Sequence, residues 1–257
     1  MQGGNRVAVI TGAGSGSGIG FATATYLAEL GVRVAILATT ERIHQRRQEL
    51  ENMGYSALSL MADLTDWRQV QNSFQEVASQ WGHIDILVNN AGMAQVNNPE
   101  LSRLTWEYSD EEWDQEINRN LKIPFLCVRA AVPLLKTRAA GRIINVASVT
   151  GPLVANPLEA PYAAAKSGLM GLTRVLALEL AEFNITVNAV APGWISTGSS
   201  TPRERVAGRY SPLKRPGTPR EVASAIAWLS SPDASYVTGQ MIVVDGGNSV
   251  VEDKSPQ

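Results

Sequence analysis

The sequence has few of the residues that build disulfides and metal sites. Cys127 is the only cysteine among 257 residues, so no intrachain disulfide can form and a reducing compartment is expected. The two histidines, His44 and His83, are far apart and lack neighbouring metal-ligand residue types, so we expect no metal site. These shortages exclude a fold held by disulfides.

Long apolar runs and blocks of one charge are also missing. No apolar segment approaches the ~20 residues that span a bilayer, so no membrane partner is expected. The formal net charge is −2, and no basic block suggests nucleic acid. The first strand-like run begins at Arg6 with no targeting segment before it, so we expect a cytoplasmic protein.

Short β-branched runs alternate with helical segments along the chain. The expected strands are 6–11, 32–37, 57–61, 84–88, 142–147, 185–190 and 241–244. The expected helices are 21–30, 41–53, 66–81, 110–137, 160–182 and 220–230. This alternation implies right-handed crossovers and a parallel sheet covered on both faces. We therefore predict one α/β domain over residues 1–257, with a doubly wound sheet of about seven strands.

Three stretches interrupt this regular pattern. Pro124 and Pro133 predict a kink or a break near each of them within the expected helix 110–137. Residues 93–109 are irregular and form either a substrate-side loop or a surface excursion. Residues 196–219 are polar and rich in Ser, Pro, Gly and Arg, which predicts a mobile lid, with basic side chains that either meet an anionic substrate or are solvated.

A glycine-rich loop joins the first expected strand to the first expected helix. It runs Gly12-Ala13-Gly14-Ser15-Gly16-Ser17-Gly18-Ile19-Gly20. A strand, a glycine loop and a helix in this order aim free backbone N–H groups at a phosphate. The pattern G-x-G-x-x-G does not occur here. T-G-x-x-x-G-x-G fits from Thr11 to Gly18, and a second register ends on Gly20 with two extra residues, so the sequence leaves both open.

Tyr162 and Lys166 lie four residues apart in the helical segment 160–182. That spacing puts the phenol and the ammonium on one face of a helix, one turn apart. At ~4 Å and an effective dielectric of ~20, one charge is worth about 4 kcal/mol, which predicts a phenol pKa lowered from ~10 towards ~7. Such a tyrosine exchanges protons at neutral pH. Taken alone, the spacing also fits an ordinary surface pair.

Four motifs follow one another in a fixed order. They are the glycine loop, Asn89-Asn90-Ala91-Gly92 after the fourth strand, Ser148 after the fifth, and Tyr162 with Lys166, the tyrosine fourteen residues after the serine. This order resembles the short-chain dehydrogenase/reductase family from about Arg6 to Gly247. Within that family the chain looks most like the 3-oxoacyl-acyl-carrier-protein reductase branch. The resemblance implies a Rossmann fold and an oxidoreductase that interconverts ketones and secondary alcohols.

The resemblance implies roles for four residues. Tyr162 would be the general acid in reduction and the base in oxidation. Lys166 would hold the ribose hydroxyls of a nicotinamide cofactor and lower the pKa of Tyr162. Ser148 would hydrogen-bond the substrate oxygen. Asn120 would anchor a water in a proton relay from Lys166, with Asn118 as a near competitor for that position.

The resemblance also implies the residues around the cofactor. Asn90 would support the pocket through hydrogen bonds, and Asp63 with Leu64 would border the adenine. Ile195 and Thr197 would lie beside the carboxamide and the phosphates. The complete expected set is Gly12, Ser15, Ser17, Gly18, Ile19, Gly20, Ala38, Thr39, Thr40, Arg42, Asp63, Leu64, Asn90, Ala91, Gly92, Tyr162, Lys166, Pro192, Gly193, Ile195 and Thr197.

The end of the second strand bears on the choice of cofactor. An acidic residue there would bind the ribose 2′-OH and repel a 2′-phosphate. Ala38 occupies that position, two threonines follow it, and Arg42 is near enough to neutralise a phosphate. We therefore expect NADP(H) rather than NAD(H). Against this, many relatives that use NADP carry a basic residue in the glycine loop where this chain has Ser17, and Glu41 is also close.

The substrate is less defined than the cofactor. Reductases of the acyl-carrier-protein branch grip the acidic carrier with basic residues at positions that look like Pro133 and Leu178 here. Arg129, Lys136 and Arg138 lie near those positions without matching them. We therefore expect a stand-alone carbonyl reductase or alcohol dehydrogenase for a small or medium ketone. The alternatives are a 3-oxoacyl-acyl-carrier-protein reductase and, less favoured, a non-catalytic cofactor-binding regulator.

Assembly is expected from the resemblance alone. The family commonly forms two-fold dimers and tetramers, which here would use 110–137, 160–182 and 241–250. We therefore expect a homotetramer or a homodimer.

Overall fold

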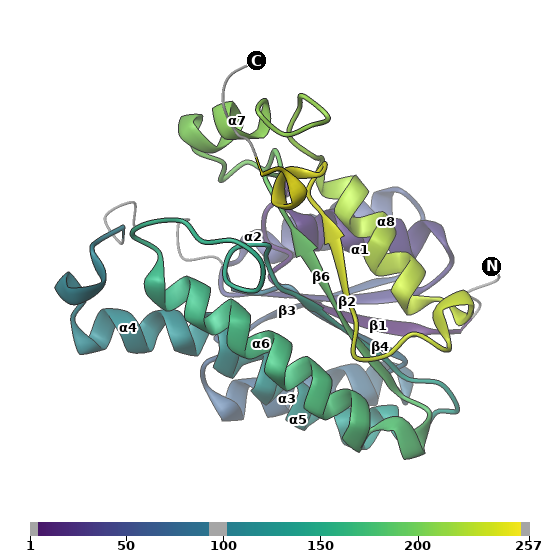
Figure 1. Ribbon diagram of the computed structural model, residues 1–257. Coiled ribbons are helices and arrows are strands. Elements are labelled where there is room, and N and C mark those ends of the chain that lie inside the picture. The colour runs from purple at the N-terminus through teal and green to yellow at the C-terminus, as the bar shows by residue number, and fades with distance from the viewer. Residues whose placement is uncertain (1–4, 93–101, 253–257) are drawn as a thin grey trace.

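Seven parallel strands form one sheet in the order β3-β2-β1-β4-β5-β6-β7 (Figure 1). The computed structural model describes residues 5–92 and 102–252, so most of the expected irregular segment 93–109 lies outside the described residues. The strands are β1 (Val7–Thr11), β2 (Arg33–Ala38), β3 (Ala57–Met61), β4 (Ile86–Asn89), β5 (Arg142–Val146), β6 (Thr186–Pro192) and β7 (Met241–Val244). The predicted doubly wound sheet is confirmed, with strand ends shifted by no more than two residues.

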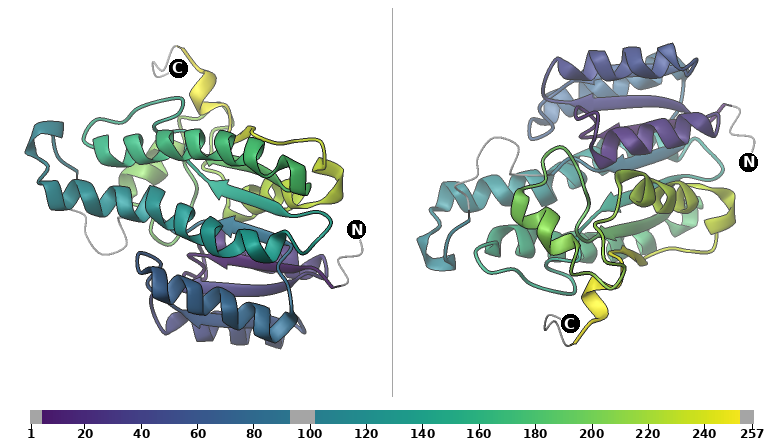
Figure 2. Two further views of the ribbon diagram at one scale, coloured as in Figure 1. Left: turned by 90° about the horizontal axis from the view of Figure 1, so that it is seen from below. Right: turned by 90° about the horizontal axis from the view of Figure 1, so that it is seen from above.

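Helices cover both faces of this sheet (Figure 2). One face carries α1 (Ile19–Glu29), α2 (Arg42–Asn52) and α8 (Pro219–Ser230). The other face carries α3 (Trp67–Trp81), α5 (Ile123–Leu135) and α6 (Ala160–Glu179). Short turns lie at Thr105–Glu107, Ala181–Phe183, Pro232–Ala234 and Asn248–Val250. Within the described ranges, no helix is both long and apolar enough to cross a membrane.

The central strand β1 shows why two helical layers are needed. Val7 and Val9 belong to the core under α3, α5 and α6, whereas Ala8 and Ile10 belong to the core under α1, α2 and α8. All four side chains are fully buried. Because successive residues of a strand point to opposite faces, a strand that is apolar throughout needs cover on both sides.

The expected long helix 110–137 is divided into three parts. α4 (Asp110–Ile117) leads into a π-helical turn at Asn118–Lys122, and α5 follows. Asn118, Lys122 and Ile123 all have helical backbone angles, so the helix continues through the π turn and Pro124 follows it directly. Pro133 lies inside α5 without ending it. Ahead of the first proline the helix therefore widens into one π turn and does not end.

The segment 196–219 contains a helix that the sequence prediction missed. This helix, α7 (Pro202–Gly208), begins with a capping box in which Thr201 Oγ1 accepts from the backbone N–H of Glu204. The ends of the segment are held together, because the Ser196 N–H donates to the Gly217 backbone oxygen at 2.8 Å. The expected lid therefore has internal structure and a closed base.

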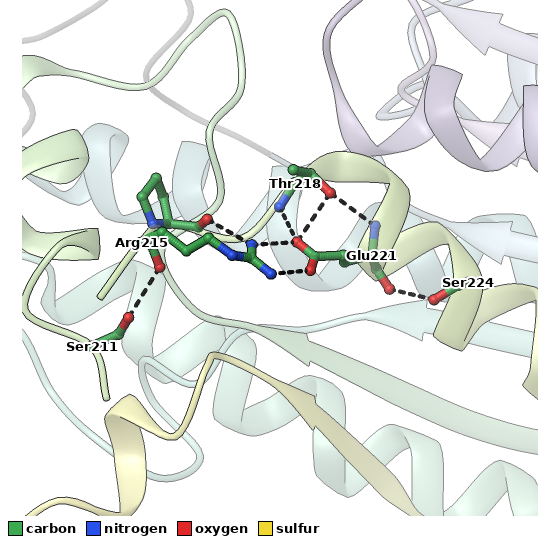
Figure 3. Close-up of polar contacts among 6 residues, drawn as sticks. Ser211, Arg215, Thr218, Glu221 and Ser224 are labelled. Atoms are coloured by element: carbon green, nitrogen blue, oxygen red, sulfur yellow. Dashed lines mark hydrogen bonds and ion pairs between the residues drawn. The ribbon is translucent and has the colours of Figure 1, made fainter. Parts of the chain in front are cut away.

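An ion pair anchors the base of this segment to α8 (Figure 3). The guanidinium of Arg215 donates to both carboxylate oxygens of Glu221, at 2.9 and 2.6 Å. The same carboxylate accepts from the N–H and the hydroxyl of Thr218, which caps α8. These bonds hold the carboxylate so firmly that the pKa of Glu221 falls to about 2.

Candidate active site

The predicted motifs meet at the carboxyl edge of the sheet. β1, β4, β5 and β6 are parallel neighbours, so their carboxyl ends lie side by side, where ligands bind in such sheets. The predicted site residues at or just beyond these ends are Gly12, Asn90, Ala91, Gly92, Ser148, Pro192 and Gly193. Residues that are far apart in the sequence are thereby collected along one edge.

The structure selects the second register of the glycine loop. α1 begins at Ile19 with Gly18 as its N-cap. A Cβ atom on Gly20 would lie 2.6 Å from the backbone oxygen of Gly12, and one on Gly12 would lie 2.8 Å from Cα of Ala91. Gly12 also has a φ of +71°, which favours glycine. The glycines that pack closely are therefore Gly12 and Gly20, and the loop between them is two residues longer than the first register requires.

The N-terminus of α1 can receive an anion. No side chain caps its first N–H groups, and its first turn contains no acidic residue. Free N–H groups and the helix dipole favour a phosphate at such an end. Ser15 and Ser17 lie in the loop before it, and the backbone oxygen of Ser15 accepts from the N–H of Gly18 at 3.1 Å.

Thr11 joins the glycine loop to β4, a role that the predicted site did not include. Its Oγ1 accepts from the N–H groups of Asn90 and Ala91, both at 3.0 Å. The Nδ2 group of Asn90 in turn donates to the backbone oxygens of Thr11 and Gly12, at 2.9 and 3.1 Å. Asn90 therefore holds the glycine loop in place by hydrogen bonds. The position of Thr11 between a buried strand and Gly12 was the signal available in the sequence.

The end of β2 lies beside the glycine loop. A Cβ atom on Gly14 would be 3.0 Å from Cβ of Ala38, so the loop and the strand end approach closely at this point. Thr39 and Thr40 are exposed, and Arg42 Nε donates to Thr40 Oγ1 at 3.4 Å. This corner therefore presents hydroxyls and a guanidinium without a carboxylate at the strand end.

The two residues expected near the adenine differ in their surroundings. Asp63 is exposed just beyond β3, and its Oδ1 accepts from the N–H and the hydroxyl of Thr65. Leu64 is buried in the core that also contains Phe74. Only the backbone of Leu64 is therefore available to a ligand.

Arg46 is a second guanidinium at this corner that sequence reasoning missed. It projects from α2 against Gly16, in the extended part of the glycine loop. Its guanidinium lies 5.5 Å from the centre of the Phe21 ring and pairs with Glu49 at 2.5 Å. The sequence offered one signal, because Arg46 follows Arg42 by four residues on one helix and so shares a face with it.

Ser148, Tyr162 and Lys166 come together where β5 faces α6. Ser148 is 9% exposed, and its Oγ accepts from the N–H of Thr150 at 3.1 Å. Tyr162 is half-buried one turn before Lys166. Lys166 is 4% exposed, and its Nζ donates to the backbone oxygen of Val146 at 3.0 Å. The same Nζ is 5.6 Å from the centre of the Tyr162 ring.

The expected lowering of the Tyr162 pKa towards neutrality is wrong for this structure. Burial raises the pKa of Tyr162 to about 12, although hydrogen bonding with Ser148 opposes the rise. Burial also lowers the pKa of Lys166 to about 8, against the raising effect of the carboxyl of Glu116. The expectation from the sequence took account of the charge of Lys166 alone, whereas burial penalises the charged form of each group.

Asn120 lies in the π turn and meets Lys166 beside Gly92. Its Nδ2 donates to the backbone oxygen and to Oε2 of Glu116, both at 3.1 Å, and its buried Oδ1 has no hydrogen bond among the described residues. A Cβ atom on Gly92 would lie 2.9 Å from Asn120 Oδ1 and 3.5 Å from Lys166 Nζ. Asn120 is fully buried, whereas its competitor Asn118 is half-exposed.

The segment after β6 closes against the glycine loop. Ile195 forms a bridge with the Gly217 region at the base of the lid segment. The hydroxyl of Thr197 is 3.0 Å from that of Ser199, and Gly198 lies against the hydroxyl of Ser17. Ile195 and Thr197, which are predicted to lie beside the nicotinamide, therefore belong to a segment that contacts the glycine loop at Ser17.

These residues fit a nicotinamide dinucleotide. The free N-terminus of α1 suits its phosphates, the close approach of Gly12 and Gly20 leaves backbone exposed to it, and Lys166 offers N–H donors at the carboxyl edge. In the part of the chain that the structure describes, no three His, Cys, Asp or Glu side chains are grouped to hold a metal ion. The donor set therefore suits an organic cofactor.

Comparison with known proteins gives concordant results. The family model described as enoyl-(acyl carrier protein) reductase matches residues 12–249. The 3-oxoacyl-[acyl-carrier-protein] reductase FabG of Staphylococcus aureus is 39% identical, over 93% of this chain and 96% of the relative.

Solved structures agree. A mutant of a short-chain dehydrogenase/reductase from Serratia marcescens is 30% identical with a TM-score of 0.88, covering 97% of this chain and 100% of that one. Levodione reductase is 32% identical with a TM-score of 0.88, covering 96% and 98%. The chain belongs to the short-chain dehydrogenase/reductase family and is an oxidoreductase of that family.

Proposed function

We propose that this chain reduces a small or medium ketone to a secondary alcohol, with NADPH as the hydride donor and Tyr162 as the proton donor. The observation that carries the proposal is the grouping of Ser148, Tyr162 and Lys166 at the edge of the sheet that also holds the glycine loop. A bound reduced nicotinamide supplies the hydride, and the side chains supply orientation and the proton.

The protonation states support reduction. Because the pKa of Tyr162 is raised to about 12, its phenol stays protonated at neutral pH and can donate to an alkoxide as that charge develops. Lys166 has a pKa of about 8 and is mostly charged at neutral pH, which suits binding of ribose hydroxyls. In this proposal Ser148 Oγ donates to the same substrate oxygen. Oxidation would need the phenolate and so would be favoured at alkaline pH.

The basic residues near the expected carrier-protein positions are already engaged. Leu178 itself is 81% exposed and carries no charge. The three neighbouring cations each have a partner: Arg129 lies over Trp67, Lys136 lies over Phe183, and Arg138 pairs with Asp85. A strongly acidic carrier protein would have to compete for them. This favours a free ketone over a carrier-bound one.

The charge around Tyr162 also favours a neutral substrate. The carboxyl groups of Glu159, Glu116 and Glu204 all raise the pKa of Tyr162, so each is close enough to act on this phenol electrostatically. Glu204 belongs to α7 of the lid segment. A negatively charged substrate group beside the phenol would be repelled by these carboxylates.

A 3-oxoacyl-acyl-carrier-protein reductase is the second candidate. The Staphylococcus aureus relative named for that activity, 39% identical over nearly the whole chain, favours it. The two candidates share the chemistry at Tyr162 and differ only in what delivers the ketone. Similarity to levodione reductase is of comparable extent in structure and does not separate them.

A substrate panel tests the proposal directly. Turnover is measured with NADPH and with NADH, on free cyclic and linear ketones and on acetoacetyl thioesters, including one linked to a carrier protein. We expect NADPH to give at least about tenfold higher kcat/KM, as one well-placed charge contact allows. Strong preference for the carrier-linked substrate would reverse the order of the two candidates, and equal turnover with NADH would contradict the cofactor choice.

Arg46 supports the choice of NADPH. It supplies a guanidinium beside the glycine loop. Many relatives that use NADP have a basic residue in that loop, at the position where this chain has Ser17. We expect Arg46→Ala to weaken 2′,5′-ADP binding about tenfold or more while 5′-AMP binding changes little, because charged hydrogen bonds contribute about 1.5–3 kcal/mol. Isothermal titration calorimetry measures both ligands.

The neighbouring Arg47 provides the matched control for that experiment. It lies on the same helix and pairs with Glu51, so Arg47→Ala removes the same charge without touching the glycine loop. Equal effects of the two variants would mean that only the net charge of α2 matters. An Arg46→Ala variant that binds both nucleotides like the parent would remove Arg46 from the phosphate site.

The proposed assembly is a homotetramer or a homodimer. The outer surface of α5 and α6 exposes Phe125, Val175 and Leu178, at 48%, 52% and 81%. Apolar side chains that protrude in this way are typical of subunit contacts.

A further inference from the structure

Glu116 is a buried acid beside the proposed catalytic residues, and the sequence analysis did not single it out. It lies on α4 next to the π turn and is only 4% exposed. A buried carboxyl group is costly unless it is paired and hydrogen-bonded. Its Oε2 accepts from Nδ2 of Asn120 at 3.1 Å, whereas its Oε1 has no hydrogen bond to any residue that the structure describes. Within residues 5–92 and 102–252, the one hydrogen bond of this carboxylate is therefore made to a proposed catalytic residue.

The bonds from Asn120 decide which way its amide faces. An asparagine amide has a donor end and an acceptor end. The donor end, Nδ2, donates to both the backbone oxygen and Oε2 of Glu116, so the acceptor end, Oδ1, faces the opposite side. That side is the neighbourhood of Gly92, where Asn120 Oδ1 and Lys166 Nζ approach the same point. The backbone oxygen and the carboxylate of Glu116 together thus leave the acceptor end of the amide on the side where Lys166 Nζ lies.

Glu116 also acts on Lys166 through its charge. α4 packs against α6. Burial raises the pKa of Glu116 and lowers that of Lys166. Arg119 and Lys166 oppose the first shift and Glu116 opposes the second, so the carboxylate and the ammonium stabilise the charged form of each other. Arg119 Nη1 lies 4.0 Å from Oε1 of Glu116. The carboxylate of Glu116 also acts electrostatically on two phenols, Tyr108 and Tyr162, and contributes to raising the pKa of each.

We propose that Glu116 is a positioning residue, which fixes the Asn120 amide beside Lys166 and supplies the negative charge that keeps the buried ammonium protonated. The inference rests on the proposed function, because it assigns Glu116 to the proton relay of that site. It adds a residue from α4 to a group otherwise drawn from α6, β5 and the π turn.

The direct test follows the titration of Lys166 by NMR. The chain contains five lysines, so the Cε signals of a protein labelled with ¹³C-lysine are few, and Lys166→Met identifies the one of interest. In Glu116→Gln the carbonyl acceptor is kept and the charge is removed. We expect the Lys166 midpoint to fall by about one unit, as loss of a nearby opposite charge predicts.

Asp114→Asn is the control, because it removes one negative charge from an exposed position of the same helix. We expect its Lys166 midpoint to match that of the parent. A Glu116→Gln midpoint equal to that of the parent would overturn the charge role. Equal shifts in Glu116→Gln and Asp114→Asn would overturn the charge role as well, because the Lys166 midpoint would then depend on the net charge of the protein and not on the position of Glu116.

The positioning role is tested by comparing two variants at Glu116. Glu116→Leu removes both the charge and the acceptor, so we expect its kcat to fall about tenfold below that of Glu116→Gln, the loss expected for about one hydrogen bond. In Glu116→Gln the alkaline limb of kcat should move to lower pH, because the ammonium and the phenol then both lose their protons more easily. Identical kcat values and pH profiles for parent and variants would overturn the role.

Failure of the proposed function looks different. It would appear as absence of ketone turnover in the parent, which leaves the NMR titration readable. Thermal unfolding of each folded variant checks that the buried substitution has not disrupted the fold.

Discussion

Tyr162→Phe is expected to lower kcat for ketone reduction by about 10³-fold, within the range that positioned acid catalysis supplies. The phenyl ring keeps the packing on α6 but has no O–H to protonate the developing alkoxide. The pKa of Tyr162 is raised to about 12, so the phenol of the parent is protonated throughout the physiological pH range. The substitution therefore removes a proton that is always present in the parent. NADPH affinity should fall by no more than about fivefold, because Tyr162 is one member of the expected cofactor set and the loss of one neutral hydrogen bond costs about 1 kcal/mol. Steady-state kinetics and NADPH fluorescence titration measure the two quantities.

Tyr236→Phe is the matched control for this experiment. Tyr236 is fully exposed between α8 and β7, so the same atom is removed far from the site. Its kinetics should equal those of the parent. Unchanged turnover in Tyr162→Phe would remove Tyr162 from the mechanism, and would revive the hypothesis of a cofactor-binding protein without catalysis.

Lys166→Met is expected to damage cofactor binding and the chemical step together. The ammonium is the donor that we assign to the ribose hydroxyls, so NADPH affinity should weaken about tenfold or more, the effect of losing a charged hydrogen bond. The kcat should fall about 100-fold, within the range for groups that take part in proton transfer. Fluorescence titration and steady-state kinetics separate the two effects. Loss of kcat with intact NADPH affinity would contradict the double role.

The same substitution should stabilise the fold near neutral pH. The pKa of Lys166 is about 8 in the folded chain against an ordinary value of 10.5, so its ammonium destabilises the folded state below pH 8 by up to about 3 kcal/mol. Loss of the bond to Val146 offsets part of this gain. As pH rises from about 8 to 10.5 the folded parent loses its buried charge, so the advantage of Lys166→Met should shrink.

Urea unfolding at pH 7 and pH 10 measures this difference. Lys122→Met is the control, because Lys122 is exposed at the end of the π turn. It should show neither the gain at pH 7 nor its loss at pH 10. A stability difference between Lys166→Met and the parent that does not change with pH would contradict the buried-ammonium account.

The layered fold and the order of the motifs were readable from local patterns. Apolar runs such as Val7–Thr11 predict strands, and helical segments of crossover length between them predict a parallel sheet. The doubly wound sheet and the membership of the family are both confirmed. Local patterns missed α7, whose Thr201 and Glu204 form a capping box within a segment that is polar overall.

The register of the glycine loop illustrates what local patterns leave open. Two overlapping glycine patterns satisfy the same local rules, and only the contact of Gly20 with Gly12 distinguishes them. The π turn before Pro124 is similar, because a proline indicates a disturbed helix but does not specify a π turn ahead of it. Packing across the sequence resolves both.

By itself the sequence determined the strand and helix pattern, the sheet class, and which residue types stand at the strand ends. Only the tertiary structure decided the pKa directions of Tyr162 and Lys166, because burial depends on what the rest of the chain places around a group. It also brought Arg46 to the glycine loop and Glu116 to Asn120, contacts that follow from how α2 and α4 pack. Electrostatic and hydrogen-bonding effects act through space, so a chain read in one dimension shows the groups without their neighbours.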